Sequence, residues 1–335
     1  SPTCVMNYEG ATGWLVGEPH KGLRAMFKMM NEARILVGLQ GLGIGEVAYQ
    51  NAYAYAKERL QGRSLRKEGP IAPDKKADPI TAHPDVRRML LTQRSFTEGA
   101  RVLALWTALN IDIAHNHPEE AKRTEADDFV QLMTPVLKSY LTGMGTEVAS
   151  IGMQVLGGYG FIKEYGMEQY VRDARITQIY EGTNGVQALD LVGRKLPAHN
   201  GRYLRRFFHP VAAFIEENRS NEKMAEFTKP LYQSLGSLQN ASAWIAQKGL
   251  GNPEEAAGAS VDYQTMFSLV AMGYIWARTA LIAQKALEAG SSEKAFYEGK
   301  IKTARFFLNK ILPEHYSLLA KITAGLKNLD LPEDY

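Results

Sequence analysis

The sequence of 335 residues contains one cysteine and no strong excess of charge of either sign. The lone Cys4 excludes an internal disulfide framework and fits a reducing compartment. A formal net charge of +3 gives no reason to expect a nucleic-acid partner. The longest apolar runs are shorter than a bilayer span, and no charged and apolar leader opens the chain. We therefore expect a protein that neither crosses a membrane nor carries a signal peptide.

Apolar residues instead recur at the three- and four-residue spacing of buried helix faces. Leu23, Met26, Phe27 and Met30 begin the first such pattern, and the length of the chain can hold two domains. The patterns predict a mainly α protein with a four-helix bundle over 19–196 and a second helical domain over 202–335. The break between them is the polar, breaker-rich segment Pro197–Gly201. The expected helices span 20–60, 83–113, 127–156, 203–218, 223–249, 261–289 and 292–326.

Several local features predict where these helices begin or bend. Thr124 with Asp127 is typical of a helix N-cap, and Pro135 should kink the third helix or mark a restart. Ser292 is a plausible cap of the last helix. At the start of the chain, residues 2–8 and 14–17 have strand character around a turn, which predicts a short β-hairpin in the segment 1–18. A hairpin this small needs a sheet to join.

The stretch from Gln154 to Gln187, QVLGGYGFIKEYGMEQYVRDARITQIYEGTNGVQ, organises the chain. Its glycine cluster at 157, 158 and 160 follows a long helical pattern, where glycine permits a sharp turn and close approach of a ligand. Glu181 follows in IYEGTN, between an aromatic residue and a turn. Burial there would raise its pKa and suit it to act as a base. Taken alone, the glycines fit a helix C-cap, and the carboxylate fits a helix N-terminus.

Taken together, QVLGGYGF and RDARITQIYEGT resemble the C-terminal signature of the FAD-dependent acyl-CoA dehydrogenases. The resemblance implies that Glu181 removes the α-proton of an acyl-CoA while the β-hydride passes to the flavin. It implies cofactor contacts from five residues: Arg59, Gln154, Gly157, Gly158 and Thr183. It implies substrate contacts from Arg34, Tyr180 and Gly182. It also implies electron-transfer flavoprotein as electron acceptor, a homodimer or homotetramer, and a cytoplasmic or mitochondrial-matrix location.

Some assignments stay open at this level. Arg34 fits a buried ion pair as well as a substrate contact. Some relatives carry the base on the first helix, at a position that aligns with Ala33 rather than Glu32; a neighbour faces elsewhere because a helix turns by roughly 100° per residue. Gly41, Gly43 and Gly45 fit close helix packing better than a phosphate loop. His115 and His117 lack a ligand set, so we expect no metal.

The resemblance covers residues 19 to 196 closely, and the second helical unit resembles the extra C-terminal domain of a longer subfamily. Residues 1–18 would then be the remnant of the family's central β-domain. We therefore expect the chain to be a C-terminal fragment that is inactive and colourless alone. The alternatives are a helical oligomerisation module or a flavin-containing DNA-protection relative with little dehydrogenase turnover.

Overall fold

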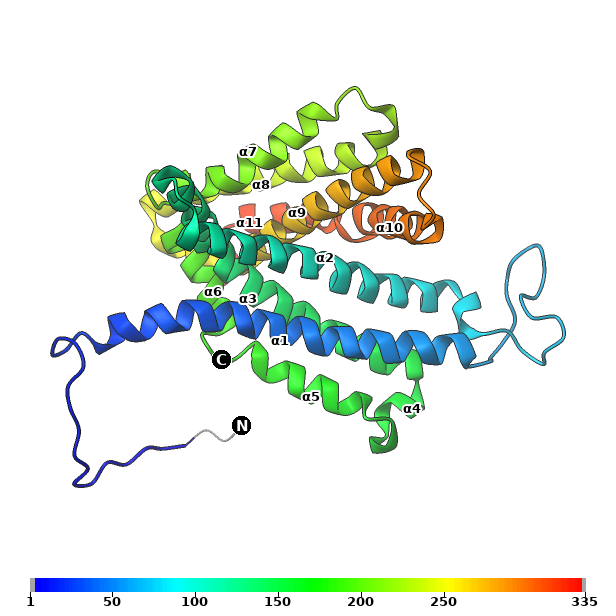
Figure 1. The fold of residues 1–335 in the computed structure, drawn as a ribbon, viewed down its shortest axis with the longest axis horizontal. Coiled ribbons are helices and arrows are strands. Elements are labelled where there is room, and N and C mark those ends of the chain that lie inside the picture. The colour runs from blue at the N-terminus through cyan, green and yellow to red at the C-terminus, as the bar shows by residue number, and fades with distance from the viewer. Residues whose placement is uncertain (1–3, 333–335) are drawn as a thin grey trace.

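The computed structural model describes residues 4–332, and Figure 1 shows that this part is helical. The helices, in chain order, are α1 (Gly22–Glu58), α2 (Pro84–Asn116), α3 (Glu120–Leu156), α4 (Gly158–Phe161), α5 (Met167–Thr177), α6 (Asn184–Asp190), α7 (Arg202–Glu217), α8 (Ala225–Gly251), α9 (Pro253–Glu288), α10 (Lys294–Phe306) and α11 (Glu314–Thr323). A short π-helix, Leu191–Lys195, continues α6. The prediction of a mainly helical protein is confirmed.

The expected β-hairpin is wrong within the described part of its span. Residues 4–21 contain no strand, and their side chains are exposed, including Val5 and Trp14. A two-stranded hairpin is marginal without neighbouring strands, and no sheet lies among residues 4–332 to receive it. Figure 1 shows that this segment extends away from the helices. The rest of the predicted hairpin, residues 2 and 3, lies outside the described residues.

Helix boundaries differ from expectation most in three helices, which are α3, α9 and the last helix. Helix α9 begins at Pro253, eight residues before the expected 261. The predicted cap at Thr124 is wrong because α3 begins at Glu120, with Glu119 before it and no side-chain cap bond. The helix passes through Pro135 without a restart. The predicted last helix is divided, because Phe307–Ile311 forms a π-helix and Pro313 precedes α11. Its start is also off by one residue, since Glu293 and not Ser292 occupies the cap position.

Helices α1 and α3 run parallel and are packed at glycine. A Cβ on Gly145 would lie 2.3 Å from the main-chain oxygen of Gly41, and a Cβ on Gly41 would lie 2.6 Å from that of Leu141. Such distances leave no room for any side chain, so the two backbones touch. The expectation of close helix packing is confirmed for Gly41 and Gly45, because Gly45 also faces Phe96 and Gly145. It is wrong for Gly43, where a Cβ would meet nothing within 4 Å. Helix α5 packs on α1 and α3 and returns the chain along the bundle (Figure 1).

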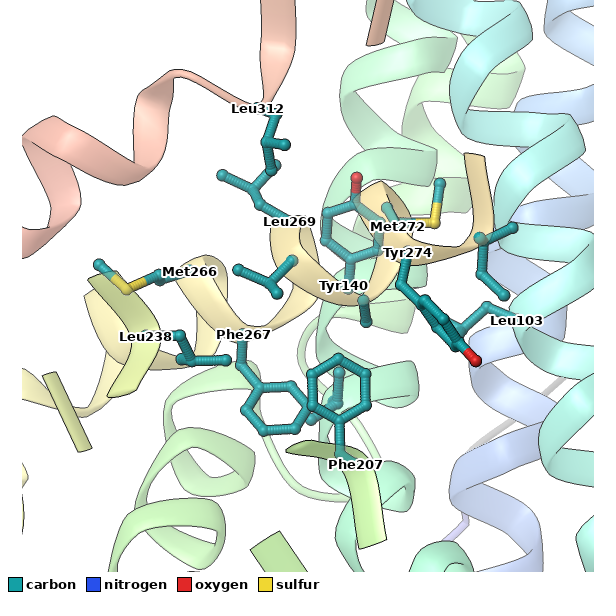
Figure 2. Close-up of a cluster of buried hydrophobic side chains, with 14 of the residues drawn as sticks. Leu103, Tyr140, Phe207, Leu238, Met266, Phe267, Leu269, Met272, Tyr274 and Leu312 are labelled. Carbon is teal, nitrogen blue, oxygen red and sulfur yellow. The ribbon is translucent and has the colours of Figure 1, made fainter. Parts of the chain in front are cut away.

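The segment 197–201 breaks the chain between helices but does not divide the core. Figure 2 shows Leu103 of α2 and Tyr140 of α3 in one buried cluster with Phe207, Phe267 and Tyr274 from the later helices. The indole N–H of the buried Trp276 donates to the main-chain oxygen of Ser95 at 3.0 Å. The two helical units therefore share one hydrophobic interior.

Helix α9 lies at the centre of the second unit, against α8, α10 and α11. Its length and composition are sufficient for a membrane span, so the estimate that every apolar run is too short was wrong for this helix. Its most apolar window is 78% buried inside the protein. A core helix surrounded on all sides has this composition because no face meets water.

Candidate functional site

Glu181 lies on a tight turn between α5 and α6, at the level of the middle of α1. Its φ is +57° and that of Gly182 is +88°, so two successive residues adopt left-handed backbone conformations. A non-glycine residue there carries strain on the order of 1 kcal/mol, and such strain gathers at functional sites. The side chain of Glu181 is half-buried. The turn therefore presents a carboxylate from a fixed backbone.

Arg34 of α1 holds this turn. Its Nε donates to the main-chain oxygen of Glu181 at 3.3 Å, and a second guanidinium nitrogen donates to Asn31 at 3.4 Å. Among the described residues, Arg34 makes no ion pair, so the ion-pair alternative is wrong for this part of the chain. Arg34 thus positions the carboxylate through its backbone and leaves the acid itself free.

Tyr180 and Gly182 flank the carboxylate. The Tyr180 hydroxyl donates to the side chain of Gln40 on α1, and the tyrosine remains 36% exposed. Burial, helped by the neighbouring Glu181, raises the pKa of Tyr180, so its hydroxyl stays a donor at neutral pH. A Cβ on Gly182 would lie 2.6 Å from the amide nitrogen of the buried Gln187. Only glycine fits between this amide and the turn.

A buried lysine lies behind the turn. The Nζ of Lys138 on α3 donates to Oδ1 of Asn184 at 3.1 Å, and the hydroxyl of Thr142 donates to the same oxygen at 3.1 Å. The amide of Asn184 donates to the main-chain oxygen of Ser139 at 3.2 Å. These bonds fix the first residue of α6 to α3. Burial, with a smaller contribution from Arg34, lowers the pKa of Lys138 to about 8.

Thr183 is the N-cap of α6. Its hydroxyl accepts from the main-chain N–H of Val186 at 3.3 Å, which satisfies one of the unpaired donors at the helix start. Gln187 donates to the main-chain oxygen of Gly182 at 3.5 Å, while its own Oε1 is buried without a partner among the described residues. The resemblance assigned Thr183 to the cofactor; the geometry adds a structural role in the same turn.

Arg59, Gly157 and Gly158 come together at the opposite end of the bundle. They line one cavity of about 490 Å³. The guanidinium of Arg59 lies 5.7 Å from the ring centre of Tyr159 and donates to Gln61 at 3.2 Å. A Cβ on either glycine would meet nothing within 4 Å, so the glycine backbone is open to the cavity. Gln154 is exposed one turn earlier on α3, and its main-chain oxygen caps the turn at Gly157.

The loop after Arg59 is fixed at its base. Main-chain bonds join Gln61 to Asp78 and Ile80 to Arg59, each at 2.9 Å. The buried carboxylate of Asp78 accepts from the N–H groups of Ser64 and Ala72 at 2.7 Å, and these bonds lower its pKa. Figure 1 shows the loop projecting beyond the helices. The base of the loop holds the backbone at Arg59 in one position.

The predicted site residues therefore form two clusters. Arg34, Tyr180, Glu181, Gly182 and Thr183 form one, while Arg59, Gly157 and Gly158 form the other, with Gln154 beside it. Arg34 and Arg59 are separated by roughly 37 Å along α1, at the rise of an α-helix. This distance exceeds the length of an extended dinucleotide. A single ligand of that size does not reach both clusters of one chain.

Glu32 is exposed on α1, two residues before Arg34. Among the described residues, Glu32 makes no hydrogen bond or ion pair to the turn at 180–183, whereas Arg34 bonds to the main-chain oxygen of Glu181. Sequence reasoning missed Lys138, Asn184 and Gln187, which build the support of that turn. The only available signal was the Gly-Thr-Asn turn itself. A lysine in a helical pattern normally indicates a solvated face, so Lys138 gave no sign of its burial.

Comparisons with known proteins cover nearly the whole chain. Residues 20–196 match the family described as acyl-CoA dehydrogenase, C-terminal domain, and residues 207–331 match the family described as acetyl-CoA dehydrogenase C-terminal like. The chain is 41% identical to a 3-methylmercaptopropionyl-CoA dehydrogenase of Ruegeria pomeroyi over 96% of its own length and 54% of that protein. It is 36% identical to a broad-specificity linear acyl-CoA dehydrogenase of Mycobacterium tuberculosis over 96% and 53%, respectively.

A solved structure shows the same fold. An acyl-CoA dehydrogenase from Bacillus anthracis, complexed with FAD, matches with a TM-score of 0.71 and 20% identity. The match covers 95% of this chain and 53% of that one. The chain thus spans about half the length of the curated relatives and of this structure.

Proposed function

Because this chain belongs to the acyl-CoA dehydrogenase family, we propose that Glu181 is the base for α,β-dehydrogenation of an acyl-CoA thioester in the full-length protein. The observation that carries the proposal is the strained turn. Two left-handed residues and the Arg34 bond to its main chain aim the Glu181 carboxylate while leaving it unpaired among the described residues. A base needs a fixed position and a free lone pair within reach of the proton it removes.

The residues present fit FAD at the Arg59 cavity. The guanidinium offers several donors to a pyrophosphate, and the bare backbone at Gly157 and Gly158 permits close approach. The nearby Tyr159 ring offers a face for stacking. When bound, FAD supplies the acceptor for the hydride that leaves the β-carbon. We assign Arg59, Gly157 and Gly158 to the adenine-diphosphate end, with Gln154 beside them.

At the Glu181 turn, the chain's own residues bind and orient the thioester. The main-chain N–H of Glu181 points from a rigid turn and is a candidate donor to the thioester oxygen, where negative charge develops as the proton leaves. Arg34 and Lys138 add positive charge behind the turn. Substrate laid against Tyr180 would exclude water from the site.

The separation of the two clusters supports a homo-oligomer. One chain would hold the adenine end of a cofactor whose flavin lies at the Glu181 turn of another copy. Exposed apolar side chains around the turn, among them Ile176, Ile179 and Val186, provide surface for such contacts. We accordingly propose a homodimer or homotetramer, with electron-transfer flavoprotein as the electron acceptor, the latter on family membership alone.

The test replaces Glu181 by glutamine in the full-length protein. This change keeps the size of the side chain and removes the proton acceptor. We expect FAD content to be unchanged and the rate of flavin bleaching by acyl-CoA to fall by a factor on the order of 10⁴. Glu32→Gln is the matched control on α1 and should bleach at the normal rate. Normal bleaching by the Glu181 variant, or loss of bleaching by the control alone, would assign the base elsewhere.

A further inference from the structure

A large cavity lies away from both clusters. It has a volume of about 660 Å³ and sits where the end of α6 meets α7, α8 and α9. One wall comes from Leu189, Val192 and Leu204, and the facing wall comes from Ile245 and Leu250. None of the residues that line it belongs to the Glu181 turn or to the Arg59 cavity.

The lining is almost entirely apolar and contains no charged residue. Its only hydroxyl, that of Ser242, is already occupied, since it donates to the main-chain oxygen of Leu238 and pairs with Tyr263 at 2.8 Å. The rim side chain of Leu250 is 90% exposed. An apolar ligand would cover this surface without stranding the Ser242 hydroxyl.

The shape of the cavity favours a thin ligand. Small residues, including Gly193, Gly201, Gly249 and Ala246, line it between the bulky side chains. A volume of this size falls within the ~300–1,000 Å³ typical of small-molecule sites. The lining thus fits a ligand with a flexible hydrocarbon chain better than a ligand with several bulky aromatic rings.

The rim has positive charge at one end. Arg194 follows Gly193 and its side chain is 80% exposed, with only a long 3.5 Å pair to Asp190. Arg205 donates to the main-chain oxygen of Asn200 at 2.8 Å and approaches Gly201 from outside. Arg205 has no carboxylate partner among residues 4–332. At the other end, the acidic residue Glu254 follows Pro253, which lines the cavity from α9. A single anionic head would therefore lie at the α7 end.

We propose that this cavity binds a fatty acid, with its unbranched hydrocarbon chain between the α6–α7 wall and the α8–α9 wall and its carboxylate at Arg205 and Arg194. The inference goes beyond the proposed dehydrogenation, because it uses none of the residues assigned to that reaction. The dehydrogenation can fail its own test while this site binds its ligand, and the converse also holds.

The direct experiment is calorimetric titration of this chain with laurate and, separately, with the neutral dodecanol. We expect both to bind, laurate with a dissociation constant on the order of 10 μM. Ala246→Phe places a ring in the cavity from α8 and should weaken both ligands at least tenfold. Ala243→Phe is the matched control, because Ala243 is exposed on the same helix but does not line the cavity.

The charge of the head is tested separately. Arg205→Gln should weaken laurate about fivefold and leave dodecanol unchanged. Arg219→Gln, at an exposed position just beyond the C-terminal end of α7, should change neither. Equal loss for the two ligands would overturn the assignment of the head group. Absence of laurate binding would overturn the site. A change of mass on light scattering with Ala246→Phe, without laurate binding, would show that a second copy covers the groove instead.

Discussion

Lys138 offers a quantitative test of how the Glu181 turn is supported. Its side chain is fully buried, and its Nζ donates one hydrogen bond, to Oδ1 of Asn184. Burial, and secondarily the positive charge of Arg34, lower its pKa from 10.5 to about 8, while Glu181 opposes the change. A difference of that size means that the charged lysine costs the folded state about 3 kcal/mol relative to the unfolded chain.

The sign of the pH dependence follows from the direction of this change. Between pH 8 and 10.5 the unfolded chain binds the lysine proton and the folded chain releases it, so stability increases as pH rises. Integrated from pH 7 to pH 9, the gain from Lys138 is about 1 kcal/mol. Lys195 also has a lowered pKa and adds to the same slope. The difference between the normal chain and a Lys138 variant isolates the contribution of Lys138.

Lys138→Met removes the charge and keeps most of the apolar length. The variant is stabilised because it no longer buries a charge, and it is destabilised by the loss of one hydrogen bond, worth about 1 kcal/mol. Asn184 Oδ1 keeps its bond from Thr142, so no acceptor is orphaned. We expect a net stabilisation of about 2 kcal/mol at pH 7, as seen when buried charges are replaced by apolar groups. At pH 9 the advantage should shrink by about 1 kcal/mol.

Urea unfolding followed by circular dichroism at pH 7, 8 and 9 measures both quantities. Lys294→Met is the control, because Lys294 is exposed and pairs only with Glu298 at 3.9 Å. Equal pH slopes in the normal chain and the Lys138 variant would refute the assigned burial cost. A variant less stable at pH 7 would show that the bond to Asn184 outweighs the desolvation of the charge.

Three further outcomes follow from contacts described above. Gly145→Ala should destabilise the chain by about 2 kcal/mol, because its Cβ would lie 2.3 Å from a main-chain oxygen of α1. Gly143→Ala is the control, because its Cβ would lie 3.7 Å from the nearest atom, the amide nitrogen of Asn184; equal melting temperatures of the two variants would disprove the close packing. Trp276→Phe should lower the free energy of unfolding by about 2 kcal/mol, because it deletes the hydrogen bond to Ser95. The variant should still unfold in a single transition, because the two helical units share one core, and two transitions would contradict that core. Arg59→Gln in the full-length protein should weaken FAD binding about tenfold without lowering the melting temperature, and unchanged FAD affinity would remove Arg59 from the cofactor site.

Much of the helical architecture was predictable because a helix with one buried face has apolar residues every three or four positions in its sequence. The pattern from Leu23 onward gave α1 to within about two residues at either end. The hairpin failed for a physical reason: strand propensity does not fold a strand without a hydrogen-bonding neighbour. The cap at Thr124 failed because a good capping residue also fits inside a helix when tertiary packing extends that helix.

The candidate site was predictable only in part. The motif located Glu181, and the glycine pattern located the cavity beside Arg59. The burial of Lys138 and the support from Gln187 depend on how α3 and α6 pack, which no local pattern records. Likewise, the breaker-rich segment at 197–201 identified a true end of a helix, but the continuity of the core across it depends on contacts such as that of Trp106 with Tyr274, whose ring centres lie 5.7 Å apart.

The backbone contact between α1 and α3 has a mechanical consequence. Helix α1 is a rod of 37 residues, about 55 Å long, and it carries Arg34 in one half and ends beside Arg59. Because Gly41 and Gly145 interlock without side chains between them, α1 has no compliant layer in which to slide by a fraction of a turn. The contact therefore holds the Glu181 turn and the Arg59 cavity at a fixed separation on one rigid pair of helices.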